Sequence, residues 1–347
     1  MGKTAIRDHN YPAGILPRQM LESALRRGFI AGADPDRLQP ASLDLTLGTR
    51  AVRLRASFLP GPGRSVTEAL GSVALHEIDL SGGAVLETGC VYLIPLRESL
   101  DLPAGLSGLA NPKSSTGRLD VFTRVICDGA TAFEAVPDGY SGPLWVEVAP
   151  RTFPVLVRPG DPLVQLRLRA GPARPLRTQT VSIDLSGTFS SDSGHVGYRA
   201  RRHSGLIDLA GVGQHPAAEF WDPLHAPGGE LVLDPDEFYI LASREAVSIP
   251  AAHAAEMAPI APEIGEFRAH YAGFFDPGFG VGDGARAVLE VRGRDVPFLL
   301  RDGQPVAKLV FEAMSAVPDR LYGASGAGGI GGSNYQGQTL KLGKHFR

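Results

Sequence analysis

The sequence has very little cysteine: Cys90 and Cys127 are the only two among 347 residues. Two cysteines exclude a disulfide scaffold and a cysteine-rich zinc site, and their scarcity fits the reducing cytoplasm. The chain also lacks any run of about 18 apolar residues, the length that a membrane-spanning helix needs. Residues 1–14 contain no apolar signal core. We therefore expect a cytoplasmic protein with no membrane partner.

An excess of charge of one sign is missing as well. The formal net charge is only −3, and no basic stripe dominates the sequence. Proteins that bind nucleic acid usually carry such a stripe, so we expect no nucleic-acid partner.

Glycine and proline, by contrast, are abundant. The 43 glycines and 28 prolines are about a fifth of the chain, against about 12% on average. They interrupt every stretch longer than about 15 residues, which excludes a helical bundle or solenoid. A hydrophobic fraction of 43% is enough for real cores. At about 100–200 residues per domain, the length predicts about two domains.

One helix and many short strands are predicted. Residues 17–28 begin with proline, end with glycine and carry an apolar stripe, which favours a helix. Short apolar or alternating segments that predict strands lie at 42–47, 51–55, 91–95, 144–148, 155–157 and 163–168. Such short strands between glycines and prolines are typical of a sandwich or jelly roll, so we expect an all-β protein.

The sequence also contains an internal repeat. Residues 92–104 match residues 239–251 at an offset of 147, as YLIPLRESLDLPA and YILASREAVSIPA. Residues 146–166 match residues 289–309 at an offset of 143. Two matches in the same order predict two copies of one β-rich domain. The predicted parts are a first domain, a polar linker, a second domain and a glycine-rich C-terminal arm, at 1–170, 171–204, 205–320 and 321–347.

The segment 113–118, KSSTGR, has the composition of an anion-binding loop. Two adjacent hydroxyls, on Ser114 and Ser115, lie between the cations Lys113 and Arg118. Hydroxyls, backbone N–H groups and cations together hold phosphate oxygens well. An ordinary loop with solvated cations is the alternative. The equivalent stretch of the second copy, 258–266, has lost both serines and both cations, which favours a function for this loop in the first copy.

Glu147 lies among apolar neighbours inside a predicted strand, where glutamate is uncommon. Apolar surroundings raise the pKa of a carboxyl group and suit it to general acid–base catalysis. A solvent-facing strand residue is the alternative. Because Glu290 repeats the position in the second copy, a structural role common to both copies is a further alternative.

The ordered motifs resemble the deoxycytidine triphosphate (dCTP) deaminase branch of the trimeric dUTPase-like superfamily. After the N-terminal helix, the segments that carry the resemblance are 39–48, 113–118, 131–148, 157–166 and 335–338. The resemblance covers most of the chain, as two tandem copies. It implies two distorted jelly-roll or β-barrel domains with short helices. It also implies hydrolysis of dCTP to dUTP and ammonia without zinc, as a step toward dTTP.

The resemblance implies roles for individual residues. Glu147 corresponds to the family's catalytic glutamate, which takes a proton from a water held near Ser115, Thr131 and Ala132, so that hydroxide attacks C4 of cytosine. Arg118 and the serines stabilise charge. The implied catalytic residues are Glu147, Arg118, Ser115 and Ala132. The implied substrate-binding residues are Lys113, Ser114, Ser115, Arg118, Thr131, Asp138, Tyr140, Tyr335 and Gln338.

The resemblance also implies cofactors and partners. We expect Mg²⁺ bound through the nucleotide triphosphate, with no direct protein ligand, and no zinc. The expected small-molecule partners are dCTP and dUTP, with dTTP as an inhibitor. The expected assembly is a homo-oligomer, a trimer of tandem chains.

Departures from the family pattern leave alternatives open. Lys113 replaces an arginine, and the spacing from Thr131 to Gly139 is one residue longer. The second copy keeps Asp276 and Glu290 but lacks the phosphate loop. We expect a catalytic first domain, and one composite site built from both copies is the alternative. Alternative functions are a dUTP pyrophosphatase, a bifunctional enzyme that performs both steps, and a non-catalytic nucleotide-binding module.

Overall fold

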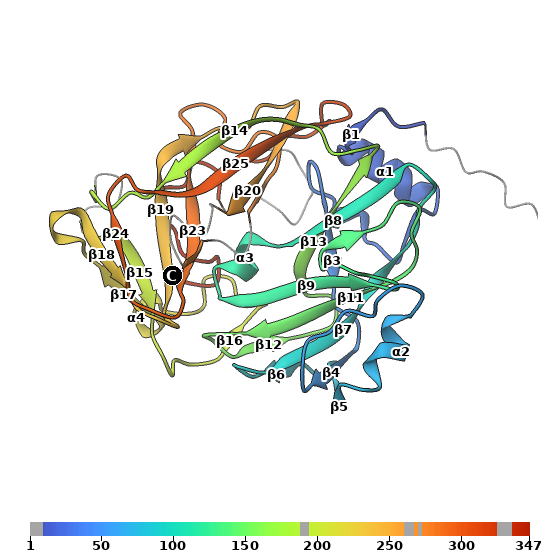
Figure 1. The fold of residues 1–347 in the computed structure, drawn as a ribbon, viewed down its shortest axis with the longest axis horizontal. Helices are drawn as coiled ribbons and strands as arrows, with labels where there is room; N and C mark the ends of the chain where they lie inside the picture. Colours follow the sequence, from blue (N-terminus) through green and yellow to red (C-terminus); the bar gives the residue numbers. More distant parts are fainter. Residues whose placement is uncertain (1–9, 188–193, 260–266, 270–272, 325–334) are drawn as a thin grey trace, which may run out of the picture.

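The computed structural model describes residues 10–187, 194–259, 267–269, 273–324 and 335–347. Strands dominate, and the few helices are short (Figure 1), so the prediction of an all-β fold is confirmed. The predicted N-terminal helix is α1, Arg18–Arg26, which buries Leu21 and Ala24. The other helices are η1 Pro35–Arg37, α2 Val66–Leu70, α3 Ser114–Gly117, α4 Ala217–Phe220 and η2 Pro227–Gly229.

The first copy forms three sheets. Its strands are β1 Gly14–Ile15, β2 Ile30–Ala31, β3 Leu43–Thr46, β4 Arg50–Leu54, β5 Ala74–Asp79, β6 Ala84–Leu86, β7 Val91–Asp101, β8 Leu106–Pro112, β9 Val121–Cys127, β10 Ala135–Val136, β11 Ser141–Pro150, β12 Val155–Val157 and β13 Pro162–Ala170. One sheet has the order β1-β13-β8-β10, with β3 also on β13. The next has the order β5-β4-β7-β11-β9, with β2 on β7. The third pairs β12 with β6.

The second copy repeats this arrangement. Its strands are β14 Pro175–Ser182, β15 Gly197–Ala200, β16 Ile207–Asp208, β17 Trp221–Leu224, β18 Glu230–Leu233, β19 Phe238–Val247, β20 His253–Pro259, β21 Phe267–Ala269, β22 Phe274–Phe275, β23 Ala285–Gly293, β24 Phe298–Arg301 and β25 Pro305–Ala313. The sheets are β14-β25-β20-β22, β17-β15-β19-β23-β21 and β18-β24. The pair β19–β23 takes the place of β7–β11, and β20–β25 takes that of β8–β13. Two tandem copies of one β fold are therefore present, as predicted.

The repeat extends to individual hydrogen bonds. The hydroxyl of Tyr92 accepts the N–H of Glu87 at 3.0 Å, and that of Tyr239 accepts the N–H of Asp234 at 2.8 Å. The buried carboxylate of Glu98 accepts the backbone N–H of Thr46 at 2.9 Å and its hydroxyl at 2.7 Å. In the second copy, Glu245 accepts the same two bonds from Ser182. The matching letters of the two repeats thus mark the same buried polar contacts.

The predicted linker at 171–204 needs correction. It contains β14, which pairs with β25, and β15, which pairs with β17 and β19. Most side chains of β14 are exposed, so its composition is polar even though its backbone is part of a sheet. Composition therefore indicated a linker where the chain forms a solvent-facing edge strand. Conversely, β16 falls in the predicted second domain but pairs in parallel with β12 of the first copy.

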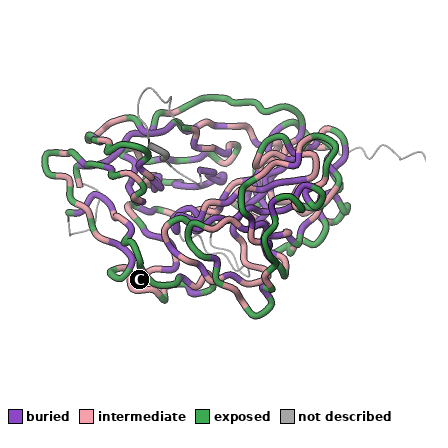
Figure 2. The backbone as a smooth tube through the Cα atoms, turned by 60° about the horizontal axis from the view of Figure 1, so that its bottom comes forward, coloured by how far each residue is buried: buried purple, intermediate pink, exposed green. Residues whose placement is uncertain are grey.

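The two copies pack against each other through an aromatic cluster. Phe153 of the first copy contacts Phe220 and Trp221, with ring centroids at 5.8 and 5.4 Å, and Phe346 near the C-terminus completes the cluster. Phe153, Phe220 and Trp221 belong to the buried core of the first copy, which extends into the second copy, and the partly buried Phe346 packs against it. The second copy also has a core of its own. Figure 2 shows the buried backbone running through the interior of both halves. The contact between the copies is thus part of the fold.

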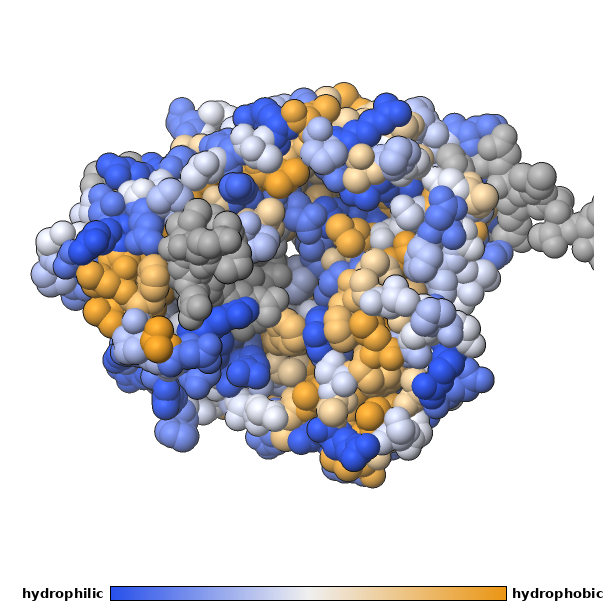
Figure 3. All heavy atoms as spheres, viewed as in Figure 1, coloured by the Kyte–Doolittle hydropathy of each residue, from blue (hydrophilic) through white to orange (hydrophobic). Residues whose placement is uncertain are grey.

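The surface of the described residues is mixed in character. Within the described residues, no helix has the length and apolar character that crossing a membrane requires. Polar and apolar side chains are interspersed over the face drawn in Figure 3. An apolar patch at the left of that view lies over β18 and β24, where the cross-strand neighbours Val232 and Leu299 are exposed.

Candidate functional site

The predicted phosphate loop forms the short helix α3, between β8 and β9. Lys113 precedes the helix with extended backbone, and Arg118 ends it. The hydroxyl of Thr116 donates to the carbonyl of Leu163 at 2.8 Å, which fixes α3 to β13. Ser115 and Arg118 are buried, and Lys113 pairs with Asp44 of β3. The loop is therefore built into the protein and is not a solvated turn.

The C-terminal segment covers α3. Arg118 Nη1 donates to the carbonyl of Lys341 and Nη2 to Oε1 of Gln338, both at 2.9 Å. The guanidinium of Arg118 also stacks on the ring of Tyr335, 3.9 Å from its centroid. Burial raises the pKa of the Tyr335 hydroxyl. The structure thus brings together Arg118, Tyr335 and Gln338, as predicted, although residues 325–334 of the predicted arm lie outside the described part of the chain.

The carboxylate that faces α3 comes from the second copy. A Cβ atom on Gly117 would lie 2.9 Å from Cδ and from Oε2 of Glu290, so this side chain rests directly on the helix. Glu290 is in β23 and is 1% exposed. Figure 1 shows α3 between the strands of its own copy and β23. The first copy supplies the loop, and the second supplies the carboxylate.

Asp276 reaches the same region from the turn after β22. Its Oδ1 accepts the backbone N–H of Ala41 at 2.9 Å. Burial, together with the nearby charge of Asp44, raises the pKa of Asp276 to about 7, while Lys113 opposes the shift. Lys344 belongs to the C-terminal segment. Burial and the nearby charge of Lys113 lower the pKa of Lys344. The carboxyl groups of Glu290, Asp276 and Asp44 and the cations Lys113, Lys344 and Arg118 therefore lie at this junction.

Glu147 has a different environment. Its Oε1 accepts hydrogen bonds from Arg124 on the neighbouring strand β9, at 3.0 Å from Nε and 2.5 Å from Nη2. The guanidinium of Arg124 lies 3.6 Å from the centroid of the Phe133 ring. Glu147 Oε2 is buried and has no hydrogen-bond partner among the described residues. The first copy thus pairs its own glutamate with an arginine of the same sheet.

The other predicted residues of the first copy stay near its own hairpin. Thr131 and Ala132 are exposed between β9 and β10. Asp138 accepts the N–H of Gly105 at 2.8 Å, and Tyr140 donates its hydroxyl to the carbonyl of Pro143 at 2.6 Å. These bonds hold the turn that leads into β11. None of the bonds joins these side chains to α3.

Sequence reasoning did not assign Glu290, Asp276 or Lys344 to the site. One signal pointed to the first two. The copies have degenerated in complementary ways, since the first keeps the serines and cations while the second keeps the Asp-Pro-Gly-Phe turn and its glutamate. Complementary losses are what one composite site leaves behind. No comparable signal marked Lys344.

The fold and this junction define a β protein that presents cations, hydroxyls and carboxylates between two copies of one domain. Comparisons with known proteins identify the family. Residues 12–172 match the N-terminal domain, and residues 165–346 the C-terminal domain, of 2'-deoxycytidine 5'-triphosphate deaminase. The chain belongs to the dCTP deaminase family, as its motifs predicted. It is therefore an enzyme, as expected.

Individual relatives agree. The chain is 30% identical to the dCTP deaminase of Ignicoccus hospitalis over 150 residues, which are 42% of this chain and 77% of that protein. It is 31% identical over 115 residues to the "dCTP deaminase, dUMP-forming" of Beutenbergia cavernae, covering 32% of this chain and 56% of that one. The crystal structure of 2'-deoxycytidine 5'-triphosphate deaminase from Agrobacterium tumefaciens is 51% identical, with a TM-score of 0.83, and covers 87% of this chain and 99% of that chain.

Proposed function

We propose that this chain hydrolyses dCTP to dUTP and ammonia at one composite site per chain. The first copy contributes α3, the second copy contributes Glu290 and Asp276, and the C-terminal segment closes over them. The observation that supports this proposal is the contact between the Glu290 carboxylate and Gly117 of α3.

The chemistry follows from the groups at the junction. Glu290 takes a proton from water, and the resulting hydroxide attacks C4 of cytosine to give a tetrahedral intermediate. Glu290 passes this proton to the ring nitrogen next to C4, and then moves the remaining proton of the new C4 hydroxyl to the amino group. The C4–N bond breaks, ammonia leaves, and the C4 oxygen becomes the carbonyl of dUTP. Glu290 is buried, so this proton transfer takes place away from bulk solvent.

The first copy and the C-terminal segment bind the triphosphate. Ser114 and Ser115 offer hydroxyl donors, and Lys113 and Lys344 offer charge. The substrate is the Mg²⁺ complex of dCTP, since phosphate oxygens are good ligands for this ion. Arg118 is held rigidly by Tyr335 and the C-terminal segment, so it offers preorganised stabilisation of developing charge. The absence of a zinc requirement stays a prediction, which metal analysis of the active protein checks.

Two matched substitutions test which glutamate reacts. We expect Glu290→Gln to lower kcat for ammonia release about 10²–10⁴-fold, the usual contribution of a general base. Glu147→Gln, the same change at the equivalent position of the first copy, should keep most of the activity if the protein folds. Ammonia release and the nucleotide product are measured with Mg²⁺ and dCTP. If instead Glu147→Gln loses activity and Glu290→Gln keeps it, Glu147 is the general base, as predicted from the sequence.

The same assay addresses the alternative functions. A relative named as dUMP-forming favours a second step, in which dUTP loses pyrophosphate. Detection of dUMP and pyrophosphate would identify a bifunctional enzyme, and dUMP formed only from dUTP would identify a pyrophosphatase. Binding of dCTP without turnover would identify a non-catalytic module. Inhibition by dTTP, a homotrimeric assembly and a cytoplasmic location also stay predictions.

A further inference from the structure

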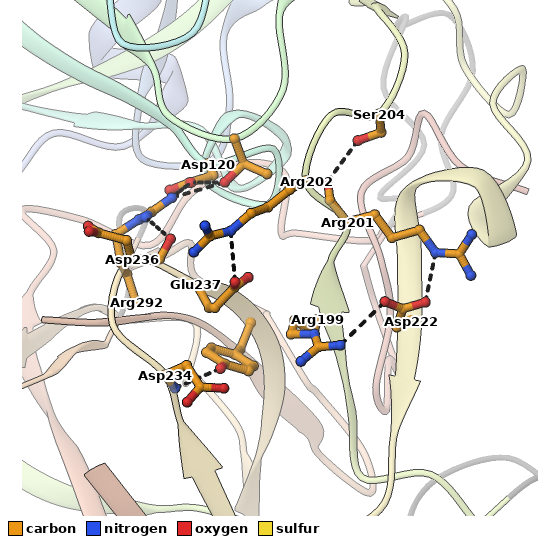
Figure 4. Close-up of polar contacts among 12 residues, drawn as sticks. Asp120, Arg199, Arg201, Arg202, Ser204, Asp222, Asp234, Asp236, Glu237 and Arg292 are labelled. Atoms are coloured by element: carbon orange, nitrogen blue, oxygen red, sulfur yellow. Dashed lines mark hydrogen bonds and ion pairs between the residues drawn. The ribbon is translucent and has the colours of Figure 1, made fainter. Parts of the chain in front are cut away.

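An ion pair between the copies lies next to the composite site. Arg292, on β23, pairs with Asp120, which follows α3 in the first copy. Arg292 Nη2 also donates to the Thr152 hydroxyl at 2.9 Å, and that hydroxyl donates to Asp120 Oδ2 at 2.5 Å. Figure 4 shows Arg292 reaching Asp120, with Asp236 beside it. The exposed fractions of the Arg292 and Asp120 side chains are 11% and 0%.

Arg292 and Glu290 reach the end of α3 from the same strand, β23. Glu290 and Arg292 are two residues apart on one strand, so they point to the same face of the sheet. Glu290 rests on Gly117, and Arg292 binds Asp120, whose N–H donates to the carbonyl of Gly117 at 2.9 Å. One face of β23 therefore meets the end of α3 at two successive points. The ion pair fixes the second point, and Glu290 lies at the first.

Two further observations suggest that this pair has more than a packing role. Asp120 is a fully buried non-glycine residue with φ of 54°, a backbone conformation that is uncommon and costs energy. In the first copy, the residue two positions after Glu147 is Ala149, so the arginine occurs only in the copy whose glutamate faces α3.

We propose that Asp120, Arg292 and Thr152 form a clasp that positions Glu290 against α3. The clasp acts through Glu290, so this inference rests on the proposed function. Proton transfer needs the base and the water within hydrogen-bond reach, and a displacement of about 1 Å can cost about 10²-fold in rate. The triphosphate groups are bound by the first copy and the C-terminal segment. Loss of the clasp therefore affects the reaction step more than substrate binding.

The test compares two ion pairs that both join the copies. Arg292→Met should lower kcat about 10²-fold and leave KM for dCTP nearly unchanged. The control is Arg169→Met, which breaks the Arg169–Glu312 pair between β13 and β25, where N and O are 2.6 Å apart. The control should keep kcat. Equal loss of kcat in both variants would show that breaking any ion pair between the copies lowers kcat, and the clasp would then have no special role.

Removal of one buried partner can unfold a protein, so a double variant separates positioning from stability. Asp120→Gly with Arg292→Met leaves no unpaired charge, and glycine accepts the backbone conformation at 120. We expect thermal stability to recover while kcat stays low. Arg292→Lys, which keeps the charge without the forked geometry, should restore kcat only in part. A wild-type kcat in the double variant would overturn the proposal that the clasp positions Glu290. If Glu290→Gln remains active, the proposed function fails instead.

Discussion

At the scale of single residues, the site keeps a buried carboxyl group whose ionisation is unfavourable. Asp276 accepts one backbone hydrogen bond and faces Asp44, Lys113 and Arg167. Burial outweighs the two cations and raises the pKa of Asp276 to about 7. In the unfolded chain this carboxyl group titrates near 4, as an ordinary aspartate does. Between these two pH values the Asp276 carboxyl group is therefore ionised in the unfolded chain and protonated in the folded protein.

This difference predicts a pH-dependent stability. The favourable contribution of Asp276 is complete below about pH 4 and is lost as the pH rises to about 7, at about 1.4 kcal/mol per pH unit. The free energy of unfolding of the wild type should therefore fall relative to Asp276→Asn across this window. Urea unfolding of both proteins at several pH values measures the difference. Asp138→Asn is the matched control, an exposed aspartate that also accepts one backbone N–H. A difference that stays constant with pH would contradict the expectation.

The two glutamates show what the sequence could and could not predict about the site. Glu147 and Glu290 occupy the same position of a repeated strand, with apolar neighbours on both sides. No local pattern separates them. The difference arises from how the copies pack, because one strand faces α3 and the other faces Arg124. Residues close together in the motif, such as Ser114, Ser115 and Arg118, could be predicted as a group because α3 forms from consecutive positions.

At the scale of elements, the C-terminal segment covers α3 through its contacts with Arg118, and its last residues are firmly attached. The N–H of His215 donates to the carbonyl of His345 at 3.0 Å, and the N–H of Arg347 donates back to His215 at 3.0 Å. Phe346 packs into the aromatic cluster, with its ring centroid 5.5 Å from that of Phe220 and 5.6 Å from that of Trp221. This anchor holds Gln338 and Tyr335 over Arg118.

Loss of the anchor should weaken substrate binding. Phe346→Ala removes the ring from the aromatic cluster, so closed molecules become a smaller fraction of the population. The apparent affinity falls by that fraction, and we expect KM for dCTP to rise about 10-fold. Phe29→Ala, which removes a buried ring from the core of the first copy, should lower the melting temperature without a comparable rise in KM. Steady-state kinetics at constant Mg²⁺ provide the measurement, and unchanged KM in Phe346→Ala would contradict the role of the anchor.

The elements also show which part of the fold could be predicted. The short strands, the helix at 17–28 and the repeat follow from alternation, end signals and matching letters, which are all local. The segment 175–182 is different, since its mostly exposed side chains give it the polar composition of a linker. Its strand conformation depends on pairing with β25, more than 120 residues further along the chain. Long-range pairing of this kind leaves little trace in local composition.

At the scale of the whole molecule, the two copies meet through different surfaces. The first copy presents α3 and Asp120, while the second presents one face of β23 with Glu290 and Arg292. Such a contact is heterologous, because each copy uses a different patch. The reciprocal contact would join Glu147 to the loop at 258–266, which lacks the serines and cations. We therefore expect a single productive junction in each chain.

Mixing inactive variants tests whether that junction lies within one chain. Arg118→Gln disables the first-copy part of the site, and Glu290→Gln disables the second-copy part. If both parts come from one chain, every molecule in an unfolded and refolded mixture carries one defect, and ammonia release stays at the level of the separate variants. If the parts come from different chains, mixed assemblies contain intact sites, and activity returns. Refolded wild-type protein at the same concentration controls for recovery. Because Phe153, Phe220 and Trp221 bury the contact between the copies, we expect no complementation.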